Sequence, residues 1–136
     1  MCVAFDASLE QAIAKFSAAI DGEIDSTSAI HQLRIHAKQM RYTLDLYKDD
    51  RPARMKLRKA IKSLQERLGA FNDVAGASGR FMAWAKAAKK PKTSRQLKKL
   101  AKAHQRQAKK LKREFFRWWP REREQLQLLL NAAKTS

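Results

Sequence analysis

Apolar side chains recur at alternating intervals of three and four residues in the stretch from Ile30 to Tyr47, and this spacing constrains the fold most strongly. The series is Ile30, Leu33, Ala37, Met40, Leu44 and Tyr47. Because an α-helix turns once every 3.6 residues, such a series lies along a single helix face. Ser26, Thr27 and Ser28 offer hydroxyl groups for an N-cap just before it. The sequence therefore predicts a helix over about 28–48 with one continuous buried stripe.

The rest of the chain shows the same helical period. Further helices are predicted over about 8–20, 52–69, 72–88 and 95–119, with a short closing helix over 126–133. Gly69 stands where a left-handed C-cap is expected, and Asn72 or Asp73 can begin the next helix. Thr93 or Ser94 can cap the long basic helix, which Pro120 is expected to stop or kink.

Turn-forming residues are scarce, with four glycines and three prolines in 136 residues. No segment shows the alternating pattern of a strand. The sequence thus predicts an all-α fold, an antiparallel helical bundle with long basic helices, and one domain over residues 1–136.

Positive charge is concentrated in the later part of the chain. Thirty Lys and Arg stand against thirteen Asp and Glu, a formal net charge of +17. Residues 86–117 hold 14 basic residues and a single acid, Glu114, whereas residues 1–25 carry a net charge of −4. A surplus of this size indicates an anionic partner, unless the chain tolerates its own repulsion.

Four groups able to carry positive charge follow the apolar stripe one residue later, at intervals of three, four and three. They are His31, Arg34, Lys38 and Arg41. A solvated helix face is the alternative interpretation, but such a face usually mixes charge signs, and here the first acid along the line is Asp45. Like charges in a row repel one another, so the pattern favours a site for an anion.

Two further basic rows have the same period. The first consists of Arg51, Arg54, Arg58, Lys62 and Gln65, and the second of Arg95, Lys99, Lys102, Arg106, Lys109 and Arg113. The first row is equally well explained as plain helix surface. The second extends over about 27 Å at 1.5 Å per residue, which suits a polyanion better than one small anion.

Several functional classes find no support in the residues. Cys2 is alone, so an intrachain disulfide is impossible and a reducing, cytoplasmic setting is expected. The sequence has no apolar stretch long enough for a membrane span, no metal-ligand spacing and no glycine-rich phosphate loop. We therefore expect no catalytic residues, no metal and no cofactor. We also expect that the protein is not an enzyme.

Two motifs together resemble one known family. The first is His31-x-x-Arg34-x-x-x-Lys38-x-x-Arg41-Tyr42, and the second is Leu64-Gln65-x-x-Leu68-Gly69-x-x-Asn72-Asp73. They are similar to the CHAD domain, the conserved histidine α-helical domain, and the basic helix that ends in Phe115, Phe116 and Trp118 or Trp119 is similar to its C-terminus. The resemblance covers about residues 27–119 and is to the C-terminal half of the family only.

The resemblance implies a fold of two similar four-helix halves, a basic groove that binds inorganic polyphosphate, and an association with polyphosphate granules. The resemblance implies that the residues of the first motif contact the polyphosphate and that Tyr42 and Gln65 support them. The predicted polyphosphate-binding residues, including those of the other rows, are His31, Arg34, Lys38, Arg41, Tyr42, Arg58, Lys62, Gln65, Lys99, Lys102, Arg106, Lys109 and Arg113. Because the chain is about half the usual family length, we expect that two copies pair as a homodimer to rebuild the two halves.

Two other functions remain open at this stage. A basic helical protein that binds RNA or DNA fits the charge equally well, although no groove-reading motif is recognisable. The other alternative is an accessory module of a polyphosphate or triphosphate hydrolase, for which metal-holding acids would be needed near the phosphates.

Overall fold

Four α-helices make up the computed structural model, which describes residues 3–47 and 51–135. They are α1 (Val3–Asp21), α2 (Thr27–Tyr47), α3 (Pro52–Ala87) and α4 (Pro91–Thr135). The described part contains no strand, so the prediction of an all-α helical bundle is confirmed.

The start of α2 follows its predicted cap. The backbone N–H of Ala29 donates to the Ser26 hydroxyl oxygen at 3.1 Å, which satisfies one of the N–H groups that a helix start leaves without a partner. All of the predicted stripe from Ile30 to Leu44 is buried. The next helix begins at Pro52 as predicted, where a proline loses no intrahelical hydrogen bond.

The predicted break at Gly69 is wrong, because α3 continues from Pro52 to Ala87. Gly69 lies between the buried residues Leu68 and Phe71, and a Cβ at this position would meet nothing within 4 Å. It is therefore an ordinary helical residue, and Asn72 and Asp73 lie inside the helix instead of beginning a new one. A glycine inside a helix costs only about 1 kcal/mol relative to alanine, which buried side chains on both sides outweigh.

The predicted start of α4 is wrong, and so is a stop of the helix at Pro120. The helix begins at Pro91, so Thr93 and Ser94 are not its cap, and the Ser94 hydroxyl instead donates to the carbonyl of Ala85 at 2.9 Å. It also continues through Pro120 to Thr135, without a separate closing helix over 126–133. Trp119 and Leu126, on either side of the proline, are both buried, and this packing holds the helix together across the missing N–H.

The chain divides into two compact units. Unit 1 comprises Met1–Leu68 and Trp118–Ser136, and unit 2 comprises Gly69–Arg117. This division describes packing within the chain and does not test the prediction of a single domain.

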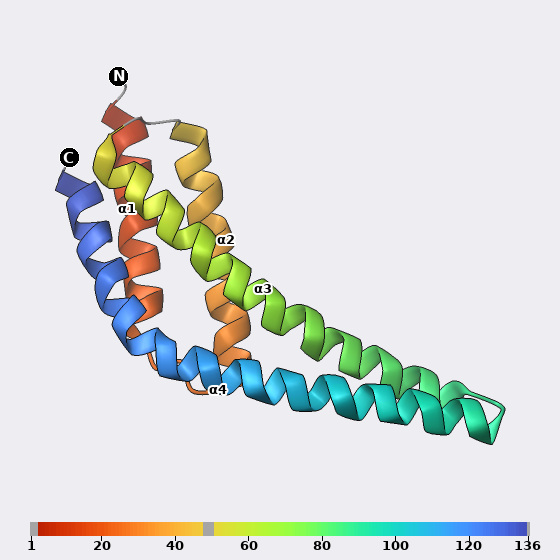
Figure 1. Cartoon of the computed structure of the whole chain (residues 1–136). Helices are drawn as coiled ribbons and strands as arrows, with labels where there is room; N and C mark the ends of the chain where they lie inside the picture. Colours follow the sequence, from red (N-terminus) through yellow and green to blue (C-terminus); the bar gives the residue numbers. More distant parts are fainter. Residues whose placement is uncertain (1–2, 48–50, 136) are drawn as a thin grey trace. The chain divides into compact units, whose positions relative to one another are not determined.

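Unit 1 is an antiparallel four-helix bundle built from α1, α2, the first part of α3 and the last part of α4 (Figure 1). Its core consists of Leu9, Ile13, Phe16, Ile20, Ile30, Leu33, Ala37, Met40, Leu44, Leu57, Ile61, Leu64, Leu68, Trp119, Leu126, Leu130 and Ala133. The first and last helices are joined by a reciprocal pair, since the Ser17 hydroxyl donates to Gln127 Oε1 at 2.6 Å and Gln127 Nε2 donates to the Ser17 carbonyl at 3.1 Å.

Unit 2 is a helical hairpin in which the second part of α3 and the first part of α4 run antiparallel (Figure 1). The Ser78 hydroxyl donates across it to the carbonyl of Ala101 at 2.9 Å. Its buried side chains are Phe71, Ala85, Ala101, Ala108 and Phe115. Small side chains therefore form most of the contact, which lets the two helices approach closely.

Candidate functional site

The predicted cation stripe lies along one flank of α2, beside the buried stripe. His31 and Lys38 are exposed, and Arg34 and Arg41 are half-buried. Each of the four comes directly after a core residue in the sequence. The packing of the core therefore fixes the direction in which the stripe points. The register that places Leu33 and Ala37 in the core thus places Arg34 and Lys38 at its edge.

Helix α3 lies alongside this flank of α2, and two arginines connect the helices. Arg41 Nη1 donates to Gln65 Oε1 at 3.1 Å, and Arg58 Nη2 donates to the carbonyl of Leu44 at 2.7 Å. The Leu44 carbonyl belongs to the last turn of α2, where carbonyl groups lack intrahelical partners and a cation is favoured. Arg58 is therefore a structural residue that caps α2, a role that the sequence did not indicate.

Asp45 lies between the same two arginines at the end of the stripe. Its carboxylate is 3.3 Å from Arg58 Nε and 4.0 Å from Arg41 Nε, and half of the Asp45 side chain is exposed. Exposed pairs of this kind contribute about 0–1 kcal/mol each. Among the described residues, His31, Arg34, Lys38 and Lys62 have no acidic partner, so the positive charge of the stripe is left uncompensated away from Asp45.

We name this set the α2–α3 basic surface. It consists of His31, Arg34, Lys38, Arg41, Arg58, Lys62 and Gln65. Tyr42, which was predicted to support it, is 58% exposed, and Lys38 Nζ lies 5.9 Å from the centre of its ring. That distance is at the long end of a cation–π contact, so the ring biases the position of Lys38 without holding it firmly.

The other predicted residues belong to unit 2. Lys99, Lys102, Arg106, Lys109 and Arg113 are all exposed on α4, and their spacing places them on one flank of that helix. We name them the α4 basic row. The structure therefore brings the α2 and α3 residues together within unit 1 and describes the α4 basic row by itself, within unit 2.

One cluster that sequence reasoning did not identify lies between α3 and α4 in unit 1. The Arg67 guanidinium lies 4.2 Å from the ring centre of Trp118, and Arg67 also attracts the Glu122 carboxylate. Burial raises the pKa of Glu122 above its ordinary value of 4.5, and the charge of Arg67 offsets only part of that effect. The half-buried aromatic side chain of Trp118 thus serves to attach α4 to the bundle.

This cluster predicts a pH-dependent gain in stability for Glu122→Gln. With a raised pKa, the folded state favours the protonated carboxyl, so the contribution of Glu122 to stability is complete below pH 4.5 and is lost as the pH rises through the folded-state pKa. The variant is expected to unfold at higher urea concentration than the parent at pH 7 and at the same concentration at pH 4. The exposed Glu124→Gln is the control, and an equal response of both variants at pH 7 would contradict the prediction.

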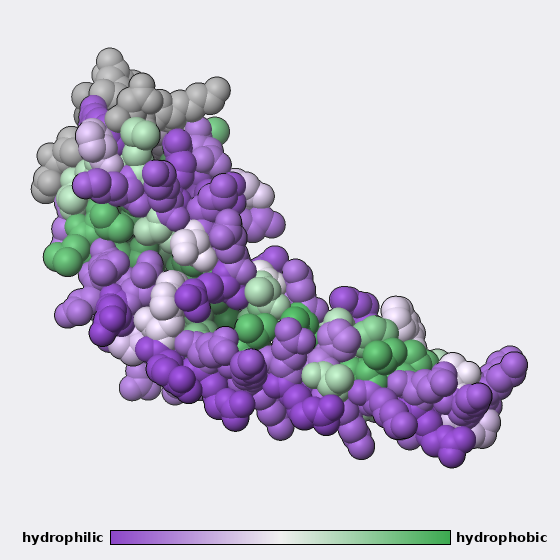
Figure 2. All heavy atoms as spheres, in the orientation of Figure 1, coloured by the Kyte–Doolittle hydropathy of each residue, from purple (hydrophilic) through white to green (hydrophobic). Residues whose placement is uncertain are grey.

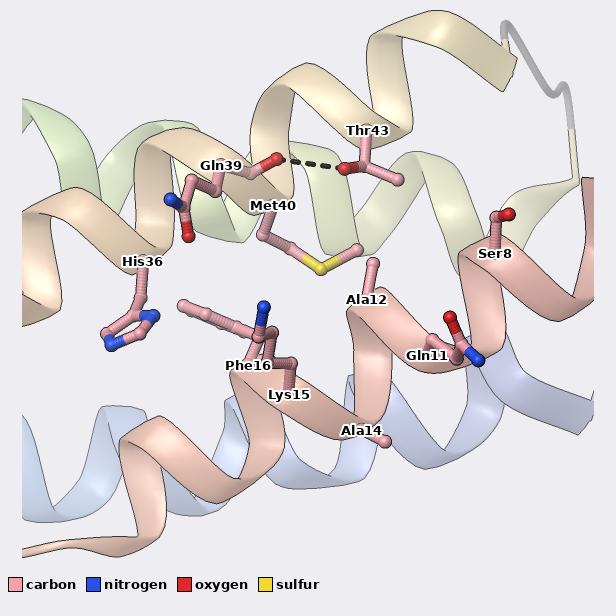
Figure 3. Close-up of a pocket in the computed structure, with 10 residues that line it drawn as sticks. All are labelled: Ser8, Gln11, Ala12, Ala14, Lys15, Phe16, His36, Gln39, Met40 and Thr43. Carbon is pink, nitrogen blue, oxygen red and sulfur yellow. Dashed lines mark hydrogen bonds between the residues drawn. The ribbon is translucent and has the colours of Figure 1, made fainter.

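A groove between α1 and α2 was also not predicted. It has a volume of about 720 Å³, and Phe16 and Met40 contribute apolar surface to it (Figure 3). His36, Gln39 and Thr43 line it from α2, and the Thr43 hydroxyl donates to the Gln39 carbonyl at 3.0 Å. These three residues lie on the flank of α2 opposite to the cation stripe, and only the pairing of the two helices makes them into a groove.

Membrane spans and metal clusters are both missing from the residues that the structure describes. None of the helices there is both long enough and apolar enough to cross a bilayer. Within the same residues there is no group of three or more His, Cys, Asp or Glu that could hold a metal ion.

Comparisons with known proteins identify one family. No curated protein matches the chain, and no solved structure does. The family model of the CHAD domain matches residues 3–82. The match includes α1 and stops before the α4 basic row, so the predicted range of 27–119 is wrong at both ends, and the restriction to the C-terminal half of the family is not borne out. The α2–α3 basic surface lies entirely within the matched residues, which are more than half of the sequence, and the chain thus belongs to the CHAD domain family.

Proposed function

We propose that this protein binds inorganic polyphosphate on the α2–α3 basic surface, that long chains also contact the α4 basic row, and that the protein catalyses no reaction. The observation that carries the proposal is that His31, Arg34 and Lys38 on α2 have no acidic partner among the described residues, within the part of the chain that matches the CHAD domain. That domain is linked to polyphosphate binding. The proposal places the protein in the cytoplasm, at polyphosphate granules.

The chemistry of the surface suits phosphoryl oxygens. Arg34 can donate two parallel N–H groups to one phosphate, and Lys38 adds a compact charge about one turn away. Arg41 is already oriented by Gln65 and therefore has fewer conformations to lose when it binds. Repeating phosphates along a polymer can meet successive cations at about the rise of one helical turn, 5.4 Å.

The nearest acid supports binding without catalysis. Asp45 is 3.3 Å from Arg58 Nε and 4.0 Å from Arg41 Nε. A carboxylate held between two guanidinium groups balances their charge, so we infer that Asp45 positions the arginines and does not activate water.

A binding titration with long-chain polyphosphate tests the proposal. Arg34→Ala and Lys38→Ala are each expected to lower the affinity about fivefold to tenfold, which corresponds to about 1–1.4 kcal/mol for one charge-assisted contact. Lys134→Ala removes an exposed charge at the far end of α4 and is the matched control. The affinity of the parent is expected to fall steeply with salt, because bound phosphates release counterions.

Three results would contradict the proposal. If all three variants bind alike, the α2–α3 basic surface is not the site. If RNA or duplex DNA displaces polyphosphate at equal phosphate concentration, the protein is a nucleic-acid-binding protein. Release of orthophosphate during the titration would show that it catalyses hydrolysis.

A further inference from the structure

The hairpin of unit 2 has two unlike flanks. On α4, Ala101 is buried against α3, Leu100 precedes it and Lys102 follows it, so the last two lie about 100° to either side of the helix contact. The α4 basic row continues on the side of Lys102. On the side of Leu100 the side chains are apolar or aromatic, and they are Leu97, Leu100, His104 and Leu111.

Helix α3 adds two aromatic residues to the apolar flank. The Phe81 ring lies 5.1 Å from the His104 ring and 5.6 Å from the Trp84 ring, measured between centroids. Trp84 is 54% exposed and Leu100 is 44% exposed. We name Phe81, Trp84, Leu97, Leu100, His104 and Leu111 the hairpin apolar face, and Figure 2 shows hydrophobic side chains gathered over this hairpin.

The edges of the hairpin apolar face carry little charge, in contrast to the opposite flank. On α4, the residues one step further out are Gln96, Ala103, Gln107 and Glu114. On α3, the corresponding edge holds Asp73 and Arg80, which have opposite signs. A second copy of this strongly basic chain therefore meets the least repulsion if it approaches at this face.

Unit 2 also lacks the core that a stable helical domain needs. Among its described side chains, three of the five that are buried are alanines. Two helices bury little apolar surface by themselves, whereas two hairpins packed together form a four-helix arrangement with an interior. Packing two hairpins together also covers Trp84 and Leu100, which are exposed to solvent in a monomer.

We propose that the hairpin apolar face is an interface between two copies of this chain, related by a two-fold axis that packs hairpin against hairpin. A two-fold interface uses the same patch on both copies, which an apolar face with near-neutral edges permits. A membrane surface is the less suitable occupant, because helices that lie on anionic lipid border their apolar side with Lys and Arg, and this face is bordered mainly by Gln, Ala and Glu.

Sedimentation equilibrium in the absence of polyphosphate tests the interface. The parent chain is expected to have about twice the mass of the 15.6 kDa monomer, and Leu100→Asp is expected to be a monomer. Leu128→Asp is the matched control, since Leu128 is 67% exposed on α4 in unit 1, and it is expected to remain a dimer. Circular dichroism of both variants confirms that helix content is retained. Added salt is expected to strengthen the dimer by screening repulsion, the reverse of its effect on polyphosphate binding.

The outcomes separate this proposal from the proposed function. A parent chain that is monomeric over the accessible concentration range would overturn the interface, as would equal dissociation of Leu100→Asp and Leu128→Asp. Binding of the parent to anionic vesicles that Leu100→Asp abolishes would assign the face to a membrane instead. A monomer that still binds polyphosphate would refute the interface alone, and a dimer that does not bind it would refute the proposed function alone.

Discussion

Replacing the whole α4 basic row by glutamine is expected to lower the affinity for long-chain polyphosphate by at least about a hundredfold. The variant changes Lys99, Lys102, Arg106, Lys109 and Arg113, all exposed, so the fold should tolerate it. Five exposed contacts at about 0.6 kcal/mol each come to about 3 kcal/mol, which is slightly more than a hundredfold. Because fewer counterions are released, the slope of log affinity against log salt should become shallower by up to about 3.5 units, by analogy with single-stranded nucleic acid.

A control is needed to distinguish the effect of net charge from the effect of the regular spacing of the α4 basic row. The matched control is a second fivefold variant with the same loss of charge away from the row, in which the exposed residues Lys56, Lys59, Lys86, Lys89 and Lys134 become glutamine. We expect the control to keep most of its affinity. Tripolyphosphate, which is too short to follow the row, should bind the row variant and the parent alike. Equal losses in both fivefold variants would mean that the protein attracts polyanions through bulk charge only.

Leu64→Ala is expected to destabilise unit 1 by about 2–5 kcal/mol. Leu64 is completely buried, in the part of α3 that belongs to unit 1. The loss is large beside the roughly 5–15 kcal/mol that stabilises an ordinary folded protein. Urea unfolding followed by circular dichroism measures it as a lower midpoint.

Leu46→Ala removes the same atoms from a leucine that is 75% exposed on α2, and a change of less than about 0.5 kcal/mol is expected. If the two variants were equally stable, Leu64 would not lie in the core.

The sequence predicted α2 in detail because every local signal agrees there. The apolar period, the Ser26 cap and the later Pro52 all indicate the same helix, and tertiary packing does not conflict with them.

Gly69 and Pro120 were misjudged because local signals conflict with packing at both positions. Glycine and proline each weaken a helix, and in a short isolated segment either one would end it. In α3 and α4 the helix is long and has buried side chains on both sides of the weak residue, so the energy of packing exceeds the local cost.

The candidate site shows the same division between local and long-range information. The stripe from His31 to Arg41 is a property of one helix and could be located from spacing. The capping of α2 by Arg58, and the pairing of Arg41 with Gln65, join residues 14 and 24 positions apart and depend on how two helices meet. The groove between α1 and α2 could not be predicted from the sequence for the same reason.

The reciprocal pair between Ser17 and Gln127 has a consequence for folding during synthesis. It joins residues 110 positions apart, and the whole of unit 2 lies between the third and fourth helices of unit 1. A ribosome therefore releases three helices of unit 1 and then the complete hairpin before residues 118–135, which close the bundle, are made. The apolar surface that residues 118–135 cover in the finished bundle stays exposed throughout that interval, since synthesis proceeds at about 5–20 residues per second. Unit 2, in contrast, is continuous in sequence and can form its helix contacts before the chain is finished.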